Sequence, residues 1–375
     1  MAGLYVHIPY CKRICNYCDF YRVVSSGSPK KYVESVISES KLRKGYIGDA
    51  KINTVYIGGG TPSTLSIKEL SLLVESLRDV YQWDKEVEFT LEVNPDDITE
   101  IYLRGIKDLG INRISIGIQS WSDRILKTMN RRHNSLQAEK AINYILDAEF
   151  KNISVDLIYG VPGLTMEEWE ETLRRTVVFD IQHLSVYHLT IEPDTVFGKM
   201  KKQGLLDEIE EEYSVAQYNL LLEITEGAGF INYEISNFGK EGFFSKHNTS
   251  YWQQIPYIGL GPSAHSFNGY SRQWNENDVD KYIEEIDNGR LPYEKEELDE
   301  KVRFNEYVMT SLRTMWGIDL DKIEEKFGKE ILDYTKNLAK KYVEYGMMLE
   351  KKGNLSLTKQ AIMVSDNIIA EFMLT

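Results

Sequence analysis

The sequence predicts an α/β protein: an incomplete (β/α)6 barrel followed by a small, mainly helical domain of winged-helix type. Strand-like apolar runs alternate with helical patterns six times up to about residue 230, and such alternation implies parallel strands with right-handed crossovers. From about residue 300 the chain becomes charged and helical, and it ends in the strand-like Leu355-Ser-Leu-Thr358 and a final helix. We therefore expect a barrel over 1–230, an aromatic-rich barrel extension over 231–300 and a C-terminal domain over 301–375.

Each predicted strand is an apolar or alternating run that is followed by a helical pattern. Ser66-Ile-Lys-Glu69 is a capping box, and Thr165-Met-Glu-Glu168 caps a later helix. The strands are expected at residues 4–8, 52–57, 87–92, 113–119, 153–159 and 183–189. The helices are expected at about 30–47, after Ser66, at 98–109, between the fourth and fifth strands up to Phe150, after Thr165, and at 207–227.

The composition is that of a folded protein without a membrane span. Hydrophobic residues make up 42% of the chain, and no apolar run approaches the roughly 18 residues that a span requires. The first residues do not have the charged and apolar regions of a signal peptide, so we expect a cytoplasmic protein with reduced thiols. The formal charge of −14 counts against extended binding to nucleic acid, although it is compatible with a local basic patch.

All three cysteines lie on the loop after the first strand, at Cys11, Cys15 and Cys18. This spacing lets one loop present three thiolates to a single inorganic centre, and soft thiolates select zinc, copper(I) or iron–sulfur clusters. A four-iron cluster normally has four cysteine ligands, so three would leave one iron open to a small molecule. A closed zinc site with His7 as fourth ligand is the alternative, whereas a disulfide would leave one cysteine unpaired.

Glycine and polar residues follow the ends of the next strands, where parallel barrels place their chemistry. Gly58-Gly-Gly-Thr61 lets the main chain approach a ligand and offer its N–H groups, although a flexible turn would also explain three glycines. Glu92, Gln119 and Asp156 lie in or at the ends of strands three, four and five. If all three side chains point to the rim at the C-terminal ends of the strands, they would form a polar ring suited to ribose hydroxyls and an ammonium group. Strand alternation also permits each of them to face solvent instead.

The cysteine spacing, with the aromatic Tyr17 before the last cysteine, resembles the signature of the radical S-adenosylmethionine (SAM) superfamily. The resemblance implies that the thiolates hold a 4Fe–4S cluster, that SAM chelates the fourth iron, and that an electron donor reduces the cluster. The cluster then cleaves SAM to methionine and a 5′-deoxyadenosyl radical. Positions that resemble the SAM-contacting residues of the family are Tyr5, Tyr17, Gly59, Gly60, Thr61, Glu92, Gln119, Arg131, Asp156 and Thr190, with Arg132 as an alternative to Arg131.

The segments around the cysteines resemble one branch of that superfamily, the oxygen-independent coproporphyrinogen III oxidases and the HemW-type haem chaperones. His247-Asn-Thr-Ser-Tyr-Trp252 is similar to the haem-binding motif of the chaperones, which implies that His247, Asn248, Tyr251 and Trp252 bind haem. Gly259-Leu-Gly-Pro-Ser-Ala-His-Ser266 resembles the same branch, and His265 is a second candidate ligand. Without the resemblance, His247 would be a surface loop residue and the two aromatics core residues.

The sequence favours a chaperone that binds haem and hands it to acceptor haemoproteins such as respiratory enzymes. Through these acceptors the chain would meet a membrane only peripherally. The alternative function is oxidative decarboxylation of coproporphyrinogen III, in which the radical abstracts a propionate hydrogen. That enzyme carries an N-terminal extension and a further cysteine two residues past the third, where this sequence has Phe20. A structural zinc protein is the third interpretation, and Met347 and Met348 are expected to fill the core rather than bind iron.

Overall fold

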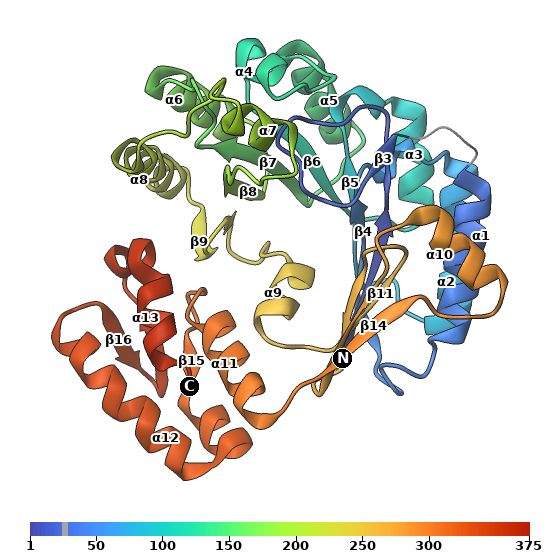
Figure 1. Cartoon of the computed structure of the whole chain (residues 1–375). Coiled ribbons are helices and arrows are strands. Elements are labelled where there is room, and N and C mark those ends of the chain that lie inside the picture. The colour runs from blue at the N-terminus through green and yellow to red at the C-terminus, as the bar shows by residue number, and fades with distance from the viewer. Residues whose placement is uncertain (25–28) are drawn as a thin grey trace.

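The computed structural model describes residues 1–24 and 29–375 and is built on one twelve-stranded sheet, ordered β14-β13-β12-β11-β1-β4-β5-β6-β7-β8-β10-β9 (Figure 1). Its six central strands pair in parallel, as predicted. Their side chains are buried almost throughout, which is usual for parallel strands with both faces covered. The central strands are β1 (Ala2–Ile8), β4 (Ile52–Gly59), β5 (Glu88–Val93), β6 (Arg113–Gln119), β7 (Ile153–Tyr159) and β8 (His183–His188).

The aromatic-rich region supplies further strands that extend this sheet at both edges. β11 (Tyr257–Leu260) pairs in parallel with β1, so the parallel run has one strand more than the sequence predicts. The remaining edge strands pair antiparallel. They are β12 (His265–Phe267), β13 (Ser271–Asn275) and β14 (Tyr293–Glu297) beyond β11, and β10 (Asn237–Gly239) and β9 (Ile231–Glu234) beyond β8.

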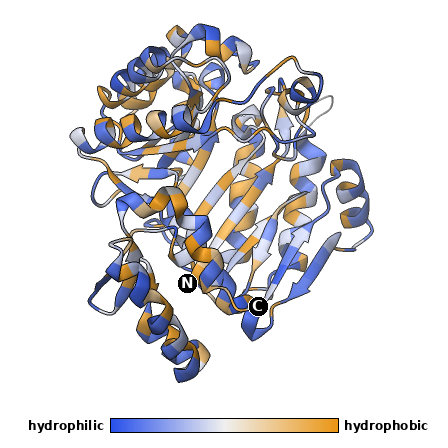
Figure 2. Ribbon diagram, turned by 60° about the vertical axis from the view of Figure 1, so that its left-hand side comes forward, coloured by the Kyte–Doolittle hydropathy of each residue, from blue (hydrophilic) through white to orange (hydrophobic). Residues whose placement is uncertain are grey.

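Helices cover the outer face of the sheet, and in Figure 2 apolar residues follow the central strands while the helices alternate between apolar and polar residues. Both predicted helix caps are present: the side chains of Ser66 and Thr165 accept from the main-chain N–H three residues on, each in a complete capping box. The helices are α1 (Pro29–Leu42), α2 (Ile67–Tyr81), α3 (Glu100–Asp108), α4 (Asp123–Thr128), α5 (Ser135–Asp147), α6 (Met166–Val177), α7 (Val196–Lys202), α8 (Glu211–Gly227), α9 (Lys246–Trp252) and α10 (Val279–Asp287).

Three helix predictions need correction. The first helix ends at Leu42 rather than near residue 47, because a series of turns that includes Gly48 with φ of 58° follows it. α8 begins at Glu211, not at residue 207. α7 was not predicted, because its seven residues are too few to show a helical period.

The C-terminal residues form a second hydrophobic core, separate from the core of the large sheet. Helices and a small sheet ordered β15-β17-β16 build this unit, which lies beside α9 (Figure 1). Met348 fills this core as predicted, but Met347 is exposed. Within 1–24 and 29–375, no helix has the length and hydropathy to cross a membrane. The elements are α11 (Glu300–Ser311), β15 (Ile318–Asp319), α12 (Leu320–Glu344), β16 (Met348–Lys351), β17 (Asn354–Leu357) and α13 (Ser365–Phe372).

Candidate functional site

The cysteine loop leaves the end of β1 and is closed at its base. β2 (Tyr10–Cys11) pairs in parallel with β3 (Val23–Val24), so the two ends of the loop lie side by side. The middle of the loop is tied to the end of α4 and the residues just after it: Asn16 donates to the carbonyl of Thr128 (2.8 Å), and Asn130 donates to the carbonyl of Ile14 (2.8 Å). The loop that carries the three thiols is therefore fixed at both its base and its tip.

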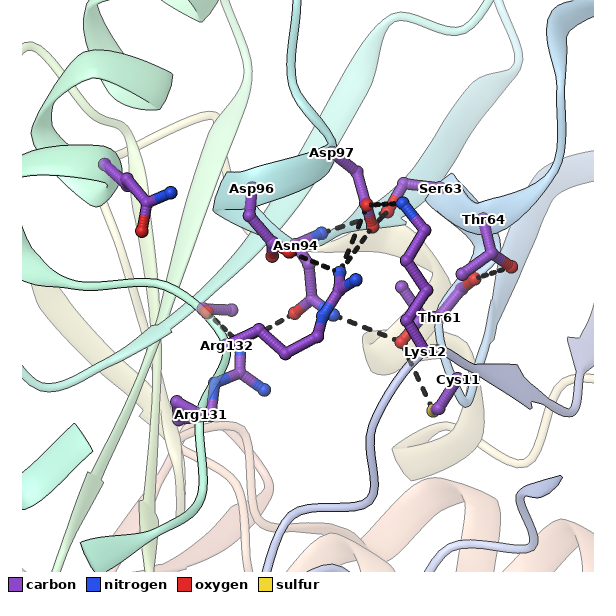
Figure 3. Close-up of polar contacts among 12 residues, drawn as sticks. Cys11, Lys12, Thr61, Ser63, Thr64, Asn94, Asp96, Asp97, Arg131 and Arg132 are labelled. Carbon is purple, nitrogen blue, oxygen red and sulfur yellow. Dashed lines mark hydrogen bonds and ion pairs between the residues drawn. The ribbon is translucent and has the colours of Figure 1, made fainter. Parts of the chain in front are cut away.

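A chain of polar contacts links Cys11 to Cys15 through residues just past the ends of β4 and β5, and Figure 3 shows the part of it from Cys11 to Arg131. The Cys11 sulfur lies 3.3 Å from the Thr61 hydroxyl, which accepts from the Asn94 amide (3.2 Å). Asn94 in turn accepts from the Arg131 guanidinium (2.6 Å), whose other nitrogen lies 3.5 Å from the Cys15 sulfur. Arg131 thus places a positive charge beside the Cys15 thiol. Its sequence neighbour Arg132 has different partners.

Arg132 belongs to a separate cluster around Asp97. Asp97 accepts from Arg132 (3.1 Å to each oxygen), from Lys12 (2.6 Å) and from Ser63 (2.9 Å) (Figure 3). Arg132 also pairs with Asp96 at 2.7 Å. Because Lys12 follows Cys11 directly, this cluster holds the start of the cysteine loop against the segments after β5 and β6.

His7 is not available as a fourth zinc ligand in this arrangement. One of its ring nitrogens lies 2.9 Å from the carbonyl of Tyr21 and the other 3.0 Å from the hydroxyl of Tyr5. Among the residues that the structure describes, no three His, Cys, Asp or Glu side chains converge on a point that one metal ion could occupy. A cluster distributes its irons over separate thiolates and does not need such convergence, so the cysteine loop fits a cluster better than a closed zinc site.

The glycine loop has a packing role that the sequence did not reveal. A Cβ atom on Gly59, whose φ is 109°, would lie 2.8 Å from the His7 ring, and one on Gly60 would lie 2.9 Å from the Pro9 carbonyl. Moreover, the Gly59 N–H donates to Glu92 (3.1 Å) and the Gly60 N–H donates to the Ile8 carbonyl (2.8 Å). The glycines therefore let the end of β4 lie against the end of β1, and these two N–H groups already have protein partners.

The three residues of the predicted polar ring lie on neighbouring strands, Glu92 on β5, Gln119 on β6 and Asp156 on β7, and Glu92 is near enough to Asp156 to feel its charge. Glu92 accepts from the Tyr56 hydroxyl (2.7 Å), and Asp156 accepts from Ser115 (2.9 Å). Burial raises the pKa of Glu92 to about 7, with a further contribution from Asp156, and burial raises the pKa of Asp156 to about 6. Gln119 has a φ of 70°, and its buried side-chain oxygen has no hydrogen-bond partner among the described residues. Such an unsatisfied acceptor fits a site for a polar ligand.

A cavity of about 570 Å³ opens beside the cysteine loop and is lined mainly by aromatic side chains. Its wall includes five of the predicted site residues, namely Tyr5, Glu92, His247, Asn248 and Tyr251, together with the second candidate ligand His265. Its volume is within the range of small-molecule and cofactor sites. Other residues around the cavity are His7, Asp19, Phe20, Tyr21, Tyr56, Tyr187, Gln254, Tyr257, Ser263, Phe267, Arg272, Glu306, Met309 and Thr310.

His247 is buried on α9, not on a surface loop, and both of its ring nitrogens are engaged. Nδ1 lies 2.8 Å from the Thr54 hydroxyl and Nε2 lies 2.8 Å from the Tyr251 hydroxyl. Burial lowers the pKa of His247 to about 3, with a further contribution from Arg113. Trp252 does not line the 570 Å³ cavity; it borders a smaller one of about 180 Å³ beside α11. Exposed Thr190 makes no hydrogen bond with its side chain within the described chain.

Tyr17 and the thiols lie in a largely buried setting. Burial raises the pKa of Tyr17, while Arg131 acts in the opposite direction and Cys15 adds to the increase. Burial also raises the pKa of Cys11, and that of Cys18 to about 11. Without a bound metal these two thiols are therefore protonated at neutral pH.

Sequence reasoning missed several polar residues of the site, among them Asn94, Asp97 and Arg272. Asn94 could have been found by the rule that identified Glu92, because it is the next polar residue at the end of β5. Asp97 and Arg272 gave no such signal, since charged residues are common in loops and at sheet edges. Arg113 is 1% exposed with two nitrogens unpaired among the described residues, and it was expected only as the first residue of a strand.

Known proteins resemble the chain along its whole length. Residues 5–176 match the Radical SAM superfamily and residues 298–364 match the HemN C-terminal domain. The heme chaperone HemW of Bacillus subtilis is 31% identical over 376 residues, covering 100% of this chain and 99% of that protein. The heme chaperone HemW of Lactococcus lactis is 33% identical over 377 residues, covering 99% of this chain and 97% of that protein.

Among solved structures, coproporphyrinogen III oxidase (HemN) from Escherichia coli has the same fold. It superposes with a TM-score of 0.85 at 21% identity, covering 99% of this chain and 89% of that chain. This likeness confirms the predicted fold, and at such identity it shows the fold alone. With the full-length relatives and the matched Radical SAM region, it follows that the chain belongs to the HemW family of the radical SAM superfamily.

Proposed function

We propose that this protein is a haem chaperone on a radical SAM scaffold, which holds a 4Fe–4S cluster and SAM, binds haem and delivers it to acceptor haemoproteins. The observation that carries the proposal is the cavity of about 570 Å³ between the cysteine loop and α9. Its tyrosines and Phe267 offer flat apolar surfaces for a porphyrin, and two of its histidines come from the motifs that suggested haem. The names of the full-length relatives support the same function.

Cys11, Cys15 and Cys18 would hold the cluster, which when bound supplies an electron and one iron site for SAM. The residues around the thiols prepare that position. Arg131 places its guanidinium 3.5 Å from the Cys15 sulfur, where its positive charge would offset part of the negative charge of a cluster bound through thiolates. The Asn94–Thr61 pair continues this contact to Cys11 and so ties the positions of the Cys11 and Cys15 thiols to each other.

The SAM-contacting residues inferred from the resemblance would lie around the C-terminal ends of the central parallel strands. Glu92 and Asp156 offer carboxylates for an ammonium group or ribose hydroxyls, and Gln119 offers an acceptor that no described group uses. Tyr17 and Arg131 are partly buried, so water screens their polar contacts less than at the surface. The remaining proposed contacts are Tyr5, Gly59, Gly60, Thr61 and Thr190.

Haem would occupy the aromatic cavity. His247, Asn248 and Tyr251 would form part of its wall, whereas Trp252, the last residue of α9, borders the smaller cavity instead. Acceptor haemoproteins and an electron donor complete the proposed set of partners. A haem site that must also release its cargo gains from side chains that can pair with one another when haem leaves, as His247 and Tyr251 do here.

The experiment is anaerobic reconstitution with iron and sulfide, haemin titration with and without SAM, and transfer to an apo-haemoprotein. We expect a saturable shift of the Soret band, followed by the acceptor's own haem spectrum when the loaded protein is added. Free haemin at the same concentration is the control for transfer. The absence of a Soret shift, or transfer no different from that of free haemin, would contradict the proposal.

One observation supports oxidative decarboxylation of coproporphyrinogen III as the second candidate. The cavity borders both the cysteine loop, at Asp19 and Phe20, and the proposed haem wall, so a porphyrinogen bound there would lie beside the cluster loop. Anaerobic incubation with coproporphyrinogen III, SAM and a reductant tests this function. Catalytic release of carbon dioxide with formation of vinyl groups would favour the decarboxylase over the chaperone.

A further inference from the structure

One wall of the 570 Å³ cavity is a face of the antiparallel extension formed by β11, β12 and β13. Phe267 is paired with Tyr257 on one side and with Arg272 on the other, and His265 is paired with Trp274. Directly paired residues lie on the same face of a sheet, as do residues two apart on one strand. These five side chains therefore share one face, and His265 lies one diagonal step from Arg272.

His265 differs from His247 in what its ring contacts. The described residues include no hydrogen-bond partner for either ring nitrogen of His265, which is stacked on Trp274 with ring centroids 6.2 Å apart. The residue is exposed and lines the cavity. Burial of part of the ring, with Arg272 nearby, lowers the pKa of His265, so its imidazole is neutral at physiological pH and can bind a metal. For His247 to bind iron, by contrast, one of two 2.8 Å contacts must break.

Arg272 is the one lysine or arginine among the described residues that line this cavity. The chain has a formal charge of −14, and haem carries two carboxylates, so a local cation must offset the repulsion that a bound dianion would meet. Arg272 is paired with Glu306 of α11 and lies 3.9 Å from Glu296. Its side chain is 32% exposed and so remains accessible to a carboxylate that competes with Glu306.

We propose that His265 binds the haem iron and that Arg272 pairs with a haem carboxylate, so that the β12–β13 hairpin is the main haem-binding element. His247 is then a positioning residue, which holds Tyr251 in the cavity wall through the 2.8 Å contact. This inference rests on the proposed function, because it assigns ligands to the haem whose binding is proposed above. It differs from the resemblance, which pointed first to His247.

The test compares haemin with iron-free protoporphyrin IX, because only haemin can report a metal ligand. His265→Ala should shift the Soret band of bound haemin and weaken its binding about 10-fold or more, while binding of iron-free protoporphyrin changes less than about 3-fold. Arg272→Gln should weaken binding of both porphyrins by about 5- to 10-fold, because both carry the carboxylates. Glu306→Gln should strengthen both, since it removes the competing carboxylate.

Matched controls are His188→Ala and Arg290→Gln, which remove a histidine and an ion-paired arginine that do not line the cavity. They should bind both porphyrins as the wild type does. Binding of iron-free protoporphyrin also shows whether a variant is folded. If His265→Ala binds neither haemin nor iron-free protoporphyrin, His265→Gln is used in its place. If the wild type binds haemin and His265→Ala retains the same spectrum and affinity, the inference is overturned while the proposed function stands. If the wild type binds no haemin, the proposed function fails as well.

Discussion

The two sides of the cavity differ in how their polar side chains are satisfied. On the cysteine side, Thr61 and Asn94, which follow the ends of β4 and β5, and Arg131, which follows α4, form a continuous chain of contacts between two thiols. On the haem side, the buried His247 is held by its neighbours, whereas His265 and Arg272 are accessible on an antiparallel edge.

This difference matches the two tasks that we propose. A resident cluster needs ligands that are fixed before it binds, because disorder in the loop would reduce affinity. A cargo must leave again, and a site whose groups can pair with protein partners, as Arg272 does with Glu306, lowers the free-energy cost of release. Single substitutions on the cysteine side should therefore reduce binding of the cluster and SAM but leave haem binding nearly unchanged. Substitutions on the proposed haem side should have the opposite pattern.

Replacing a cysteine should have the largest effect. Cys15→Ser should reduce cluster iron and acid-labile sulfide after anaerobic reconstitution by about 10-fold or more, because serine is a poor ligand for a soft iron–sulfur centre. The same variant should bind haemin within about 3-fold of the wild type, since no thiol lines the cavity. Equal loss of cluster and haem would show that the two sides are not independent, and an unchanged cluster content would contradict the assignment of Cys15.

The two neighbouring arginines provide the next test. Arg131→Gln should weaken SAM binding to the reconstituted protein by roughly 10- to 100-fold, because the guanidinium contacts both the Cys15 sulfur and Asn94. Arg132→Gln is the matched control: its partners are Asp96 and Asp97 and not the thiols, so we expect a smaller loss of SAM binding than for Arg131→Gln. Equilibrium binding of SAM measures both. A larger loss for Arg132 would favour the alternative considered from the sequence.

The parts that the sequence predicted best are those on the cysteine side. Parallel strands bury continuous apolar runs, so β6 and β7 have the bounds that were expected, and the carboxylates of Glu92 on β5 and Asp156 on β7 are near enough to influence each other. The two capping boxes could also be predicted from the sequence, because each depends on residues only three positions apart.

The haem side was predicted less well because its contacts join distant segments. β11 has four residues and gave too short a pattern to be recognised as a parallel strand. The partners of His247 include Thr54, which lies on β4 and is 193 positions away. Arg272 faces His265 only because of the register of two short strands, and no periodicity specifies that register in advance.

Glu92 offers a test through pH. Its pKa is raised by burial from 4.5 to about 7, so the folded state binds a proton more tightly than the unfolded state. The associated stability is present below pH 4.5 and is lost as pH rises to about 7, an effect of up to about 3 kcal/mol. Urea unfolding between these pH values should show that the free energy of unfolding of Glu92→Gln increases relative to that of the wild type as pH rises. The control Glu241→Gln, at an exposed position, should show no such gain. If the difference in unfolding free energy between the wild type and Glu92→Gln did not change with pH, the burial argument would be contradicted.

The smallest expected effect distinguishes the two histidines. Tyr251→Phe keeps the ring but removes the hydroxyl 2.8 Å from His247 Nε2, and should cost about 1 kcal/mol in the free energy of unfolding. It also frees that nitrogen on the cavity side. If His265 binds iron, the Soret band of bound haemin should not move in this variant. If His247 is the ligand, haemin should bind more tightly, because iron no longer competes with the tyrosine. Haemin titration of Tyr251→Phe beside Tyr251→Phe/His265→Ala therefore separates the assignments: the double variant should retain the Soret shift only if His247 can take the iron.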